Sequence, residues 1–192
     1  MKSSNTQTRL VKRTIKKFQT IALMLLVTPA LLVLSTSNAI AGWNSGYYAC
    51  KKTEIADVSD LTITEGAEAL GLNVLVSVIP PDVAELLDSS ENITVFAPTD
   101  EAFGNIPTDI LSAIAVNDEV LTTVLAYHVS PKLVDPRKVL YIRKVGTLAE
   151  QNLFVNRARN APKVNQSNVE CQGYRTANGL VWVIDSVLLP QF

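Results

Sequence analysis

The stretch from residue 92 to residue 107, NITVFAPTDEAFGNIP, constrains the fold more than any other part of this chain. Over residues 93–97 its side chains alternate with a period of two, and both sides of the segment carry apolar groups. This pattern is typical of a strand that is partly covered on both faces. Pro98 has no amide hydrogen to donate to a neighbouring strand, so the strand is predicted to end there.

A short capped helix is predicted directly after this strand. The hydroxyl of Thr99 can accept a hydrogen bond from an amide of the first helical turn. Asp100 and Glu101 place negative charge at the positive end of the helix dipole. Gly104 and Pro107 are expected to end the helix after little more than one turn.

The first 41 residues have the pattern of a secretory signal peptide. A basic segment without acidic residues precedes an apolar run at residues 21–34, and Ala-Ile-Ala at residues 39–41 forms a cleavage motif. The apolar run is shorter than the ~20 residues that a membrane span needs. We therefore expect residues 1–41 to be removed and the protein to be secreted, periplasmic or on the cell surface. The alternative is an uncleaved anchor, which would be its only link to a membrane.

The remainder of the chain is acidic. Six of the 17 Lys and Arg residues lie in residues 1–41, so residues 42–192 carry 11 basic and 18 acidic side chains, a formal net charge of −7. Nucleic acids and anionic lipids are bound mainly through Lys and Arg, so neither is an expected partner. The doublets at 51–52 and 137–138 are isolated, and the basic residues between 143 and 163 are interpreted as a solvated face.

Residues 42–192 have a length typical of one domain, and their two cysteines lie near its ends. Cys50 falls in an N-terminal extension, residues 42–53, and Cys171 lies in the domain expected over residues 54–192. In an oxidising compartment this pair predicts one disulfide that closes a long loop and contributes ~3–5 kcal/mol. Two free thiols are the alternative. Zinc would need more ligands than two cysteines and one histidine, so no metal or cofactor is expected.

Helical and extended patterns occupy different halves of the domain. Helical periodicity dominates from residue 54 to about 130, apart from the strand at 93–97, and extended segments follow from about 132. Asn178 and Gly179 predict a hairpin turn before the last strand. This segregation indicates an α+β fold or a β-sandwich with a helical cap, and not an alternating βαβ arrangement.

Two of the expected helices depend on particular residues. One is predicted to begin near residue 54, with Ile55, Val58 and Leu61 on its apolar face; another is predicted to be capped by Thr108. The buried face of the second is expected to be Ile110, Leu111, Ile114 and Ala115.

Three motifs stand in order along the domain: TVFAPTDEAF at residues 94–103, Tyr127-His128-Val129, and NGLVWVIDSVLLP at residues 178–190. Together they resemble the fasciclin-type (FAS1) domain of secreted and cell-surface adhesion proteins, over roughly residues 54–190. The resemblance implies an α+β fold in which antiparallel β-sheets form a wedge or sandwich and several helices pack along one side. It also implies a set of structural signature residues, namely Thr99, Asp100, Phe103, Asn178 and Gly179.

The Tyr-His motif is the candidate binding site. His128 follows an apolar helical face and is interpreted as a buried, hydrogen-bonded imidazole. Tyr127 either projects outward or lies half-buried with its hydroxyl bonded, and the sequence leaves both open. In animal fasciclin domains the equivalent motif is linked to integrin binding, so the resemblance makes Tyr127 and His128 the hypothetical ligand-binding residues.

No catalytic constellation is visible. The single histidine has no nucleophile or paired carboxylates with which to act, and G-x-S-x-G and metal-ligand motifs are absent from the sequence. We expect a non-catalytic, exported cell-adhesion or matrix-binding module whose partner is a cell-surface or matrix protein or a polysaccharide. The alternative is a structural cell-envelope protein without adhesive activity.

Overall fold

The computed structural model describes residues 45–139, 143–157 and 161–191, and the predicted signal peptide lies outside them. The helices are α2 (Ser45–Lys52), α3 (Ile63–Ala69), α4 (Asn73–Val78), α5 (Pro81–Ser89), α6 (Asp100–Gly104), α7 (Thr108–Ala115) and α8 (Asp118–Tyr127), with a 3-10 turn η1 (Pro136–Lys138). The strands are β1 (Ala56–Asp57), β2 (Ile93–Pro98), β3 (Val129–Ser130), β4 (Arg143–Gly146), β5 (Asn152–Arg157), β6 (Pro162–Val164), β7 (Ser167–Arg175) and β8 (Gly179–Ile184).

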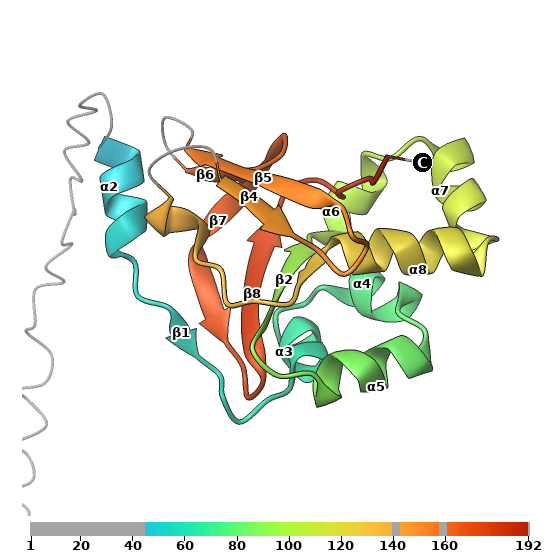
Figure 1. The fold of residues 1–192 in the computed structure, drawn as a ribbon, viewed down its shortest axis with the longest axis horizontal. Helices are drawn as coiled ribbons and strands as arrows, with labels where there is room; N and C mark the ends of the chain where they lie inside the picture. The colour runs from blue at the N-terminus through green and yellow to red at the C-terminus, as the bar shows by residue number, and fades with distance from the viewer. Residues whose placement is uncertain (1–44, 140–142, 158–160, 192) are drawn as a thin grey trace, which may run out of the picture. The chain divides into compact units, whose positions relative to one another are not determined.

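The strands form a strongly bent sheet in the order β3-β2-β8-β7-β6-β5-β4, with β1 beside β7. The amide of Leu148, just after β4, donates to the carbonyl of Val129 in β3 over 2.9 Å, so the two ends of the strand order come close together. Helices α3 to α8 gather on one side of the sheet (Figure 1). The predicted α+β fold, with sheets in a wedge and helices along one side, is confirmed.

Two strand pairs run parallel, which the antiparallel prediction did not include. β2 lies parallel to β8, and β1 lies parallel to β7. Antiparallel neighbours are usually joined by short hairpins, whereas parallel neighbours need long connections. β2 and β8 are separated by the whole segment from residue 99 to residue 178, so no hairpin sets their relative direction.

β2 and β8 form the centre of the molecule, and every residue of both strands is buried. Because successive side chains point to opposite faces of a strand, each strand contributes to two apolar clusters. Val95 and Val181 belong to the cluster under the helices, whereas Phe96 and Trp182 belong to the cluster inside the bent sheet. The prediction of a strand covered on both faces is confirmed.

The helix predicted from residue 54 is wrong. Residues 56–57 form β1, and the amide of Val58 donates to the carbonyl of Arg175 over 2.8 Å. The first helix after the N-terminal extension is α3, which Thr62 begins with a capping box: its hydroxyl accepts from the amide of Glu65, and the carboxylate of Glu65 accepts from the amide of Thr62. Residues 56–57 pair with β7 and are therefore extended, although the apolar residues around them are spaced as in a helix. The predicted extension itself contains helix α2.

The predicted start and buried face of α7 are also partly wrong. Pro107 precedes the helix, and Thr108 is its first residue and caps nothing. Of the four residues predicted to face the core, only Ile114 is buried, while Ile110 is 42% exposed, because this short helix touches the core along a narrow stripe. Among the described residues no single helix is long and apolar enough to span a membrane; α7 and α8 meet that test only as a pair, bent by 105°.

Candidate functional site

The first signature segment joins the sheet to the helices. Thr99 caps α6, since its hydroxyl accepts a hydrogen bond from the amide of Ala102 over 3.2 Å. The carboxylate of Asp100 accepts from the amide of Val74 over 2.9 Å, which ties the start of α6 to the start of α4. Phe103 packs into the cluster under the helices. Each of these residues therefore makes structural contacts.

The second signature segment joins β8 to the opposite end of the helical layer. The side-chain amide of Asn178 donates to the carbonyls of Leu87 and Ser90, over 2.7 and 2.8 Å, and its oxygen accepts from the amide of Ile63 over 3.2 Å. A Cβ at Gly179 would lie 2.3 Å from the carbonyl oxygen of Ile93. Glycine is thus required where β8 starts against β2.

Tyr127 points into the molecule. Its side chain is 6% exposed and belongs to the cluster inside the bent sheet. The hydroxyl donates to the carbonyl of Asn152 over 3.4 Å and accepts from the side-chain amide of Asn165 over 3.1 Å. Of the two orientations that the sequence left open, the structure shows the buried one, with a bonded hydroxyl.

His128 is buried on the other side of the same helix end. Its Nδ1 donates to the carbonyl of Val124 over 2.7 Å, and its Nε2 accepts from the amide of Leu188 over 2.9 Å. This pattern requires the neutral tautomer with the proton on Nδ1. Burial lowers the pKa of His128 to about 4, against a smaller opposing effect of the Val124 carbonyl. Neither residue of the motif offers its side chain to a partner at the surface.

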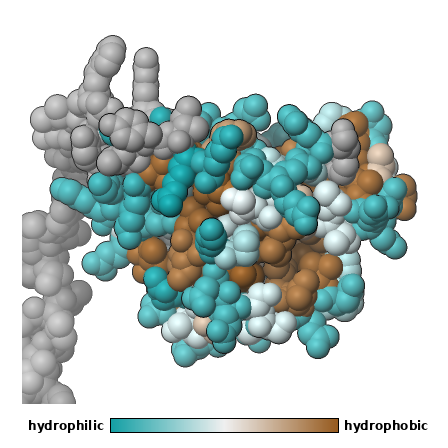
Figure 2. Space-filling view, in the orientation of Figure 1, coloured by the Kyte–Doolittle hydropathy of each residue, from teal (hydrophilic) through white to brown (hydrophobic). Residues whose placement is uncertain are grey.

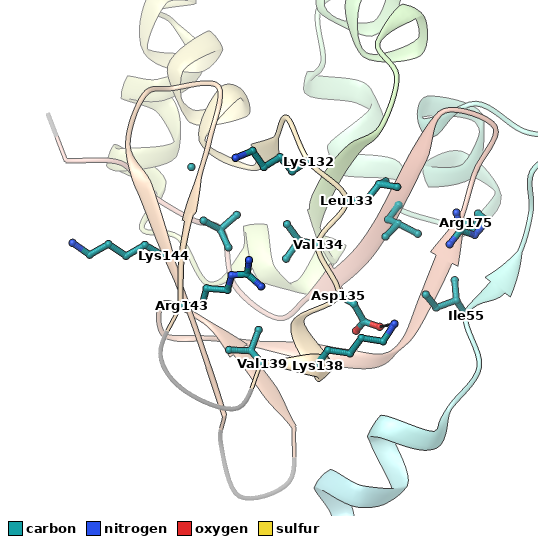
Figure 3. A pocket seen from close by; sticks show the side chains of 13 residues that line it. Ile55, Lys132, Leu133, Val134, Asp135, Lys138, Val139, Arg143, Lys144 and Arg175 are labelled. Carbon is teal, nitrogen blue, oxygen red and sulfur yellow. Dashed lines mark ion pairs between the residues drawn. The ribbon is translucent and has the colours of Figure 1, made fainter.

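A cleft of about 420 Å³ lies between the loop at residues 132–139, strand β4 and the end of β7 (Figure 3). We call it the cationic cleft. Its basic lining residues are Lys132, Lys138, Arg143, Lys144 and Arg175. Its apolar lining residues are Ile55, Leu133, Val134, Val139, Val145 and Leu180. The cleft thus combines positively charged groups with aliphatic surface.

Asp135 is the acidic residue among the lining residues that the structure describes, and its charge is already compensated. Its carboxylate accepts from Nε and Nη2 of Arg137, each over 3.0 Å, and lies 3.5 Å from Nζ of Lys138. Burial opposes ionisation of Asp135, but the hydrogen bonds and charge of Arg137, with Lys138, outweigh it and hold its pKa below the usual value. The cleft therefore stays positive.

The central strands hold the loop that forms one wall of this cleft. The hydroxyl of Thr94 in β2 donates to the carbonyl of Lys132 over 2.7 Å and accepts from the amide of Val134 over 2.9 Å. The indole of Trp182 in β8 donates to the carbonyl of Val134 over 2.9 Å. The guanidinium of Arg137 lies 4.8 Å from the centre of the Trp182 ring. Thr94 and Trp182, which belong to two of the sequence motifs, thus position the cleft without lining it.

A model of the fasciclin domain family matches residues 72–190. The chain belongs to the fasciclin domain family. The resemblance stated from the three motifs is therefore confirmed.

Several known proteins are similar to this fasciclin domain protein. Immunogenic protein MPB70 of Mycobacterium bovis is 38% identical over 102 residues, which cover 53% of this chain and 52% of that protein. The match thus spans about half the length of MPB70. Cell surface glycolipoprotein MPB83 of the same species is 28% identical over 173 residues, 85% of this chain and 78% of that protein. Protein sll1483 of Synechocystis is 31% identical over 143 residues, 72% and 78% of the two chains.

The solved structure of a FAS1 domain pair from the insect cell adhesion molecule Fasciclin I is also similar, with a TM-score of 0.49 and 17% sequence identity. The match covers 65% of this chain and 46% of that one.

The disulfide of this fasciclin domain lies close to the cationic cleft. Cys50 in α2 is bonded to Cys171 in β7 across a sequence separation of 121. Arg137 donates through Nη1 to the carbonyl of Thr53, three residues after Cys50, and to the carbonyl of Cys171 itself. The disulfide and Arg137 therefore fasten the N-terminal helix to the turn that carries Lys138.

A second hollow of the fasciclin domain, of about 330 Å³, lies beneath α3, α5 and α8 and has an almost wholly apolar lining. Leu86 and Leu148 are exposed at its edge, and apolar surface is gathered between α5 and α8 on the face drawn in Figure 2. His128 lies among its lining residues without a carboxylate or cysteine beside it there. An isolated neutral imidazole does not form an acid–base or nucleophilic pair.

No group of three or more His, Cys, Asp and Glu side chains in the part of the chain that the structure describes is placed to hold a metal ion.

The cationic cleft has no continuous signal in the sequence. The interpretation of residues 143–163 as a solvated face treated Arg143 as one of several scattered charges. The structure brings it together with Lys132 and Arg175, which are separated from it by 11 and 32 positions of sequence. No periodic pattern connects these residues, because a loop, an edge strand and the end of a second strand supply one each.

Proposed function

We propose that this protein is an exported, non-catalytic adhesion or matrix-binding module that recognises a protein or polysaccharide at its surface. Membership of the fasciclin family supports this proposal, and so does the similarity to MPB83, which is named a cell surface glycolipoprotein. The basic and apolar N-terminal segment with its Ala-Ile-Ala motif supports export. In this proposal residues 1–41 are the signal peptide, residues 42–53 the extension and residues 54–192 the fasciclin domain.

One observation carries the proposal: the side chains of the Tyr-His motif are buried, whereas the cationic cleft is an exposed, charged and concave surface. Tyr127 and His128 are bonded inside the molecule. The cationic cleft opens to solvent and contains the exposed side chains of Lys132 and Arg143. Recognition surfaces are concave and combine apolar area with a few placed polar groups. We therefore assign recognition to the cleft, and we assign Tyr127 and His128 the indirect role of holding the scaffold around it.

Binding of the purified full-length protein to a panel of host cells, matrix proteins and polysaccharides tests the proposal. Saturable binding to at least one member, retained by Tyr127→Phe and reduced by Arg143→Glu, is the expected result. Circular dichroism and urea unfolding establish that each variant is folded. A folded protein that binds nothing on the panel would contradict adhesion and favour the structural role in the envelope. Turnover of a panel polysaccharide would contradict the non-catalytic assignment.

A further inference from the structure

The cationic cleft concentrates positive charge in a domain whose net charge is negative. Five of the 11 basic residues in residues 42–192 line it, although that part of the chain has a net charge of −7. Asp135 is paired with Arg137 and Lys138 and does not offset the remaining cations. An acidic domain that gathers positive groups around one concavity is arranged to attract negative charge at that place.

The cations differ in how strongly they are engaged. Within the described residues the side chains of Lys132 and Arg143 have no ion pair or hydrogen bond, whereas Lys138 is paired with Asp135. Nζ of Lys144 lies 5.7 Å from the centre of the Phe154 ring. The pKa of Asp57 is lowered mainly by hydrogen bonds from Ser59 and, to a smaller extent, by the charge of Arg175. Lys132 and Arg143 are thus the cations most available to a ligand.

The positions of the cationic side chains indicate how negative charge should be spaced in a ligand. Arg143 and Val145 lie on the same side of β4, since strand side chains alternate, and Figure 3 shows Arg143 directed into the cleft. Lys132 comes from the loop and Arg175 from the end of β7, so the positive groups surround the cleft and do not converge on one point (Figure 3). Such spacing suits several anionic groups along a chain better than one isolated anion.

We propose that the cationic cleft binds a linear polysaccharide that bears carboxylate groups, an inference that rests on the proposed function. Guanidinium groups bind carboxylates with two parallel hydrogen bonds, and lysines add positive charge. Leu133 is exposed and Val134 and Ile55 are partly exposed, so these three residues offer aliphatic surface to the C–H faces of sugar rings. A volume of about 420 Å³ lies within the range of small-ligand sites and accommodates a short segment of such a chain.

Other polyanions fit less well. A nucleic acid is held by many phosphate contacts, and a domain with a net charge of −7 repels it away from the cleft. A bilayer presents its charge as a flat surface, whereas these cations surround a concavity. A neutral polysaccharide is usually bound by aromatic stacking, and the lining residues that the structure describes include no aromatic side chain. An acidic peptide shares the carboxylates and is distinguished by experiment.

Calorimetric titration of the full-length protein with an oligogalacturonate tests the inference. The comparison probes are a neutral glucan oligomer of equal length, poly-L-glutamate and vesicles containing phosphatidylglycerol. The cleft variant is Lys132→Glu with Arg143→Glu. The matched control is Lys51→Glu with Lys52→Glu, which reverses the same number of charges at exposed positions outside the lining. If the cleft variant does not fold, Arg143→Gln replaces it.

We expect saturable oligogalacturonate binding, weakened about tenfold or more in the cleft variant and less than about twofold in the control. Added salt should weaken it, because exposed charges are screened. Absence of binding, or equal loss in the control, would overturn the inference. Equal or stronger binding of poly-L-glutamate or of the vesicles would overturn it in favour of a peptide or a membrane. If the cleft variant still binds cells or matrix while oligogalacturonate does not bind, the inference fails and the adhesion proposal survives.

Discussion

At the scale of single residues, His128 makes the stability of the fold depend on pH. Its pKa is lowered to about 4 in the folded protein, while an unfolded histidine has a pKa of 6.5. Between these values the unfolded chain binds a proton that the folded chain does not, so stability rises with pH. The contribution is complete above pH 6.5 and is lost as the pH falls toward 4. We predict that the free energy of unfolding falls by about 2 kcal/mol between pH 7 and pH 5 from this group.

Urea unfolding at the two pH values measures this change. The control is His128→Gln, which removes the titrating group and should show a much smaller fall over the same interval. The carboxylates with lowered pKa values, such as Asp135, act below this interval, because they lose their stabilising charge only as the pH falls through the acidic range. An equal fall in the wild type and the variant would show that His128 does not control this part of the pH profile.

Tyr127 allows the binding and structural roles of the Tyr-His motif to be separated. Tyr127→Phe keeps the ring in the cluster inside the sheet and removes the hydroxyl that Asn165 and Asn152 contact. We predict a loss of about 1 kcal/mol in the free energy of unfolding, the usual net value of such hydrogen bonds. Ligand affinity should stay within about twofold of the wild type, since the hydroxyl is buried. A large loss of binding from a variant of normal stability would place the binding site at Tyr127 itself.

At the scale of secondary-structure elements, the parallel pair of β2 and β8 depends on Gly179. A Cβ there would lie 2.3 Å from the carbonyl oxygen of Ile93 and 3.0 Å from Cδ1 of Ile63. The oxygen belongs to a paired central strand and cannot move without disturbing the register. We predict that Gly179→Ala lowers the free energy of unfolding by about 3 kcal/mol, at the upper end for overpacked cores. Thermal and urea unfolding measure the loss.

Gly104 provides the matched control for this substitution. It lies in α6, and apart from its chain neighbours and the backbone of its own helix no atom lies within 4 Å of the Cβ that alanine would add. Alanine is favoured over glycine in helices by roughly 0.5–1 kcal/mol, so Gly104→Ala should leave stability unchanged or slightly raise it. Similar effects of the two substitutions would mean that the close approach of β8 to β2 does not restrict residue 179.

The elements that were predictable from the sequence are those with local signals. The strand before Pro98 and the helix after Thr99 both follow from neighbouring residues, and both are present. β1 could not be predicted, because only its pairing with β7, more than 110 residues away, makes it a strand. The cationic cleft could not be predicted for the same reason, since Lys132, Arg143 and Arg175 come together only after the sheet has formed. Local chemistry indicates elements, and long-range pairing assembles the site.

At the scale of the whole molecule, one end of the sheet is fastened to the N-terminal helix at several points. The disulfide joins α2 to β7, Arg137 bonds to the carbonyls of Thr53 and Cys171, and the side chain of Gln172 donates to the carbonyl of Glu54 over 2.8 Å. These contacts lie beside the turn that carries Asp135 and Lys138. Helix α2 is therefore fastened to the turn that forms part of the cleft wall, although α2 itself does not line the cleft.

The disulfide should determine how stable the whole domain is without determining its fold. It closes a loop between residues 121 positions apart, and restricting so long a loop in the unfolded chain contributes about 5 kcal/mol on the chain-entropy model. Total stabilities are typically 5–15 kcal/mol, so this is a large share. We predict that reduction with dithiothreitol lowers the free energy of unfolding by about this amount. The far-ultraviolet circular dichroism should stay native-like, because the central strands β2 and β8 contain no cysteine. The double variant Cys50→Ser, Cys171→Ser should have the same free energy of unfolding as the reduced protein. Dithiothreitol should not change that value. An unfolding midpoint that reduction leaves unchanged would show that Arg137 and the neighbouring hydrogen bonds already hold this end of the molecule and that the bridge adds nothing to them.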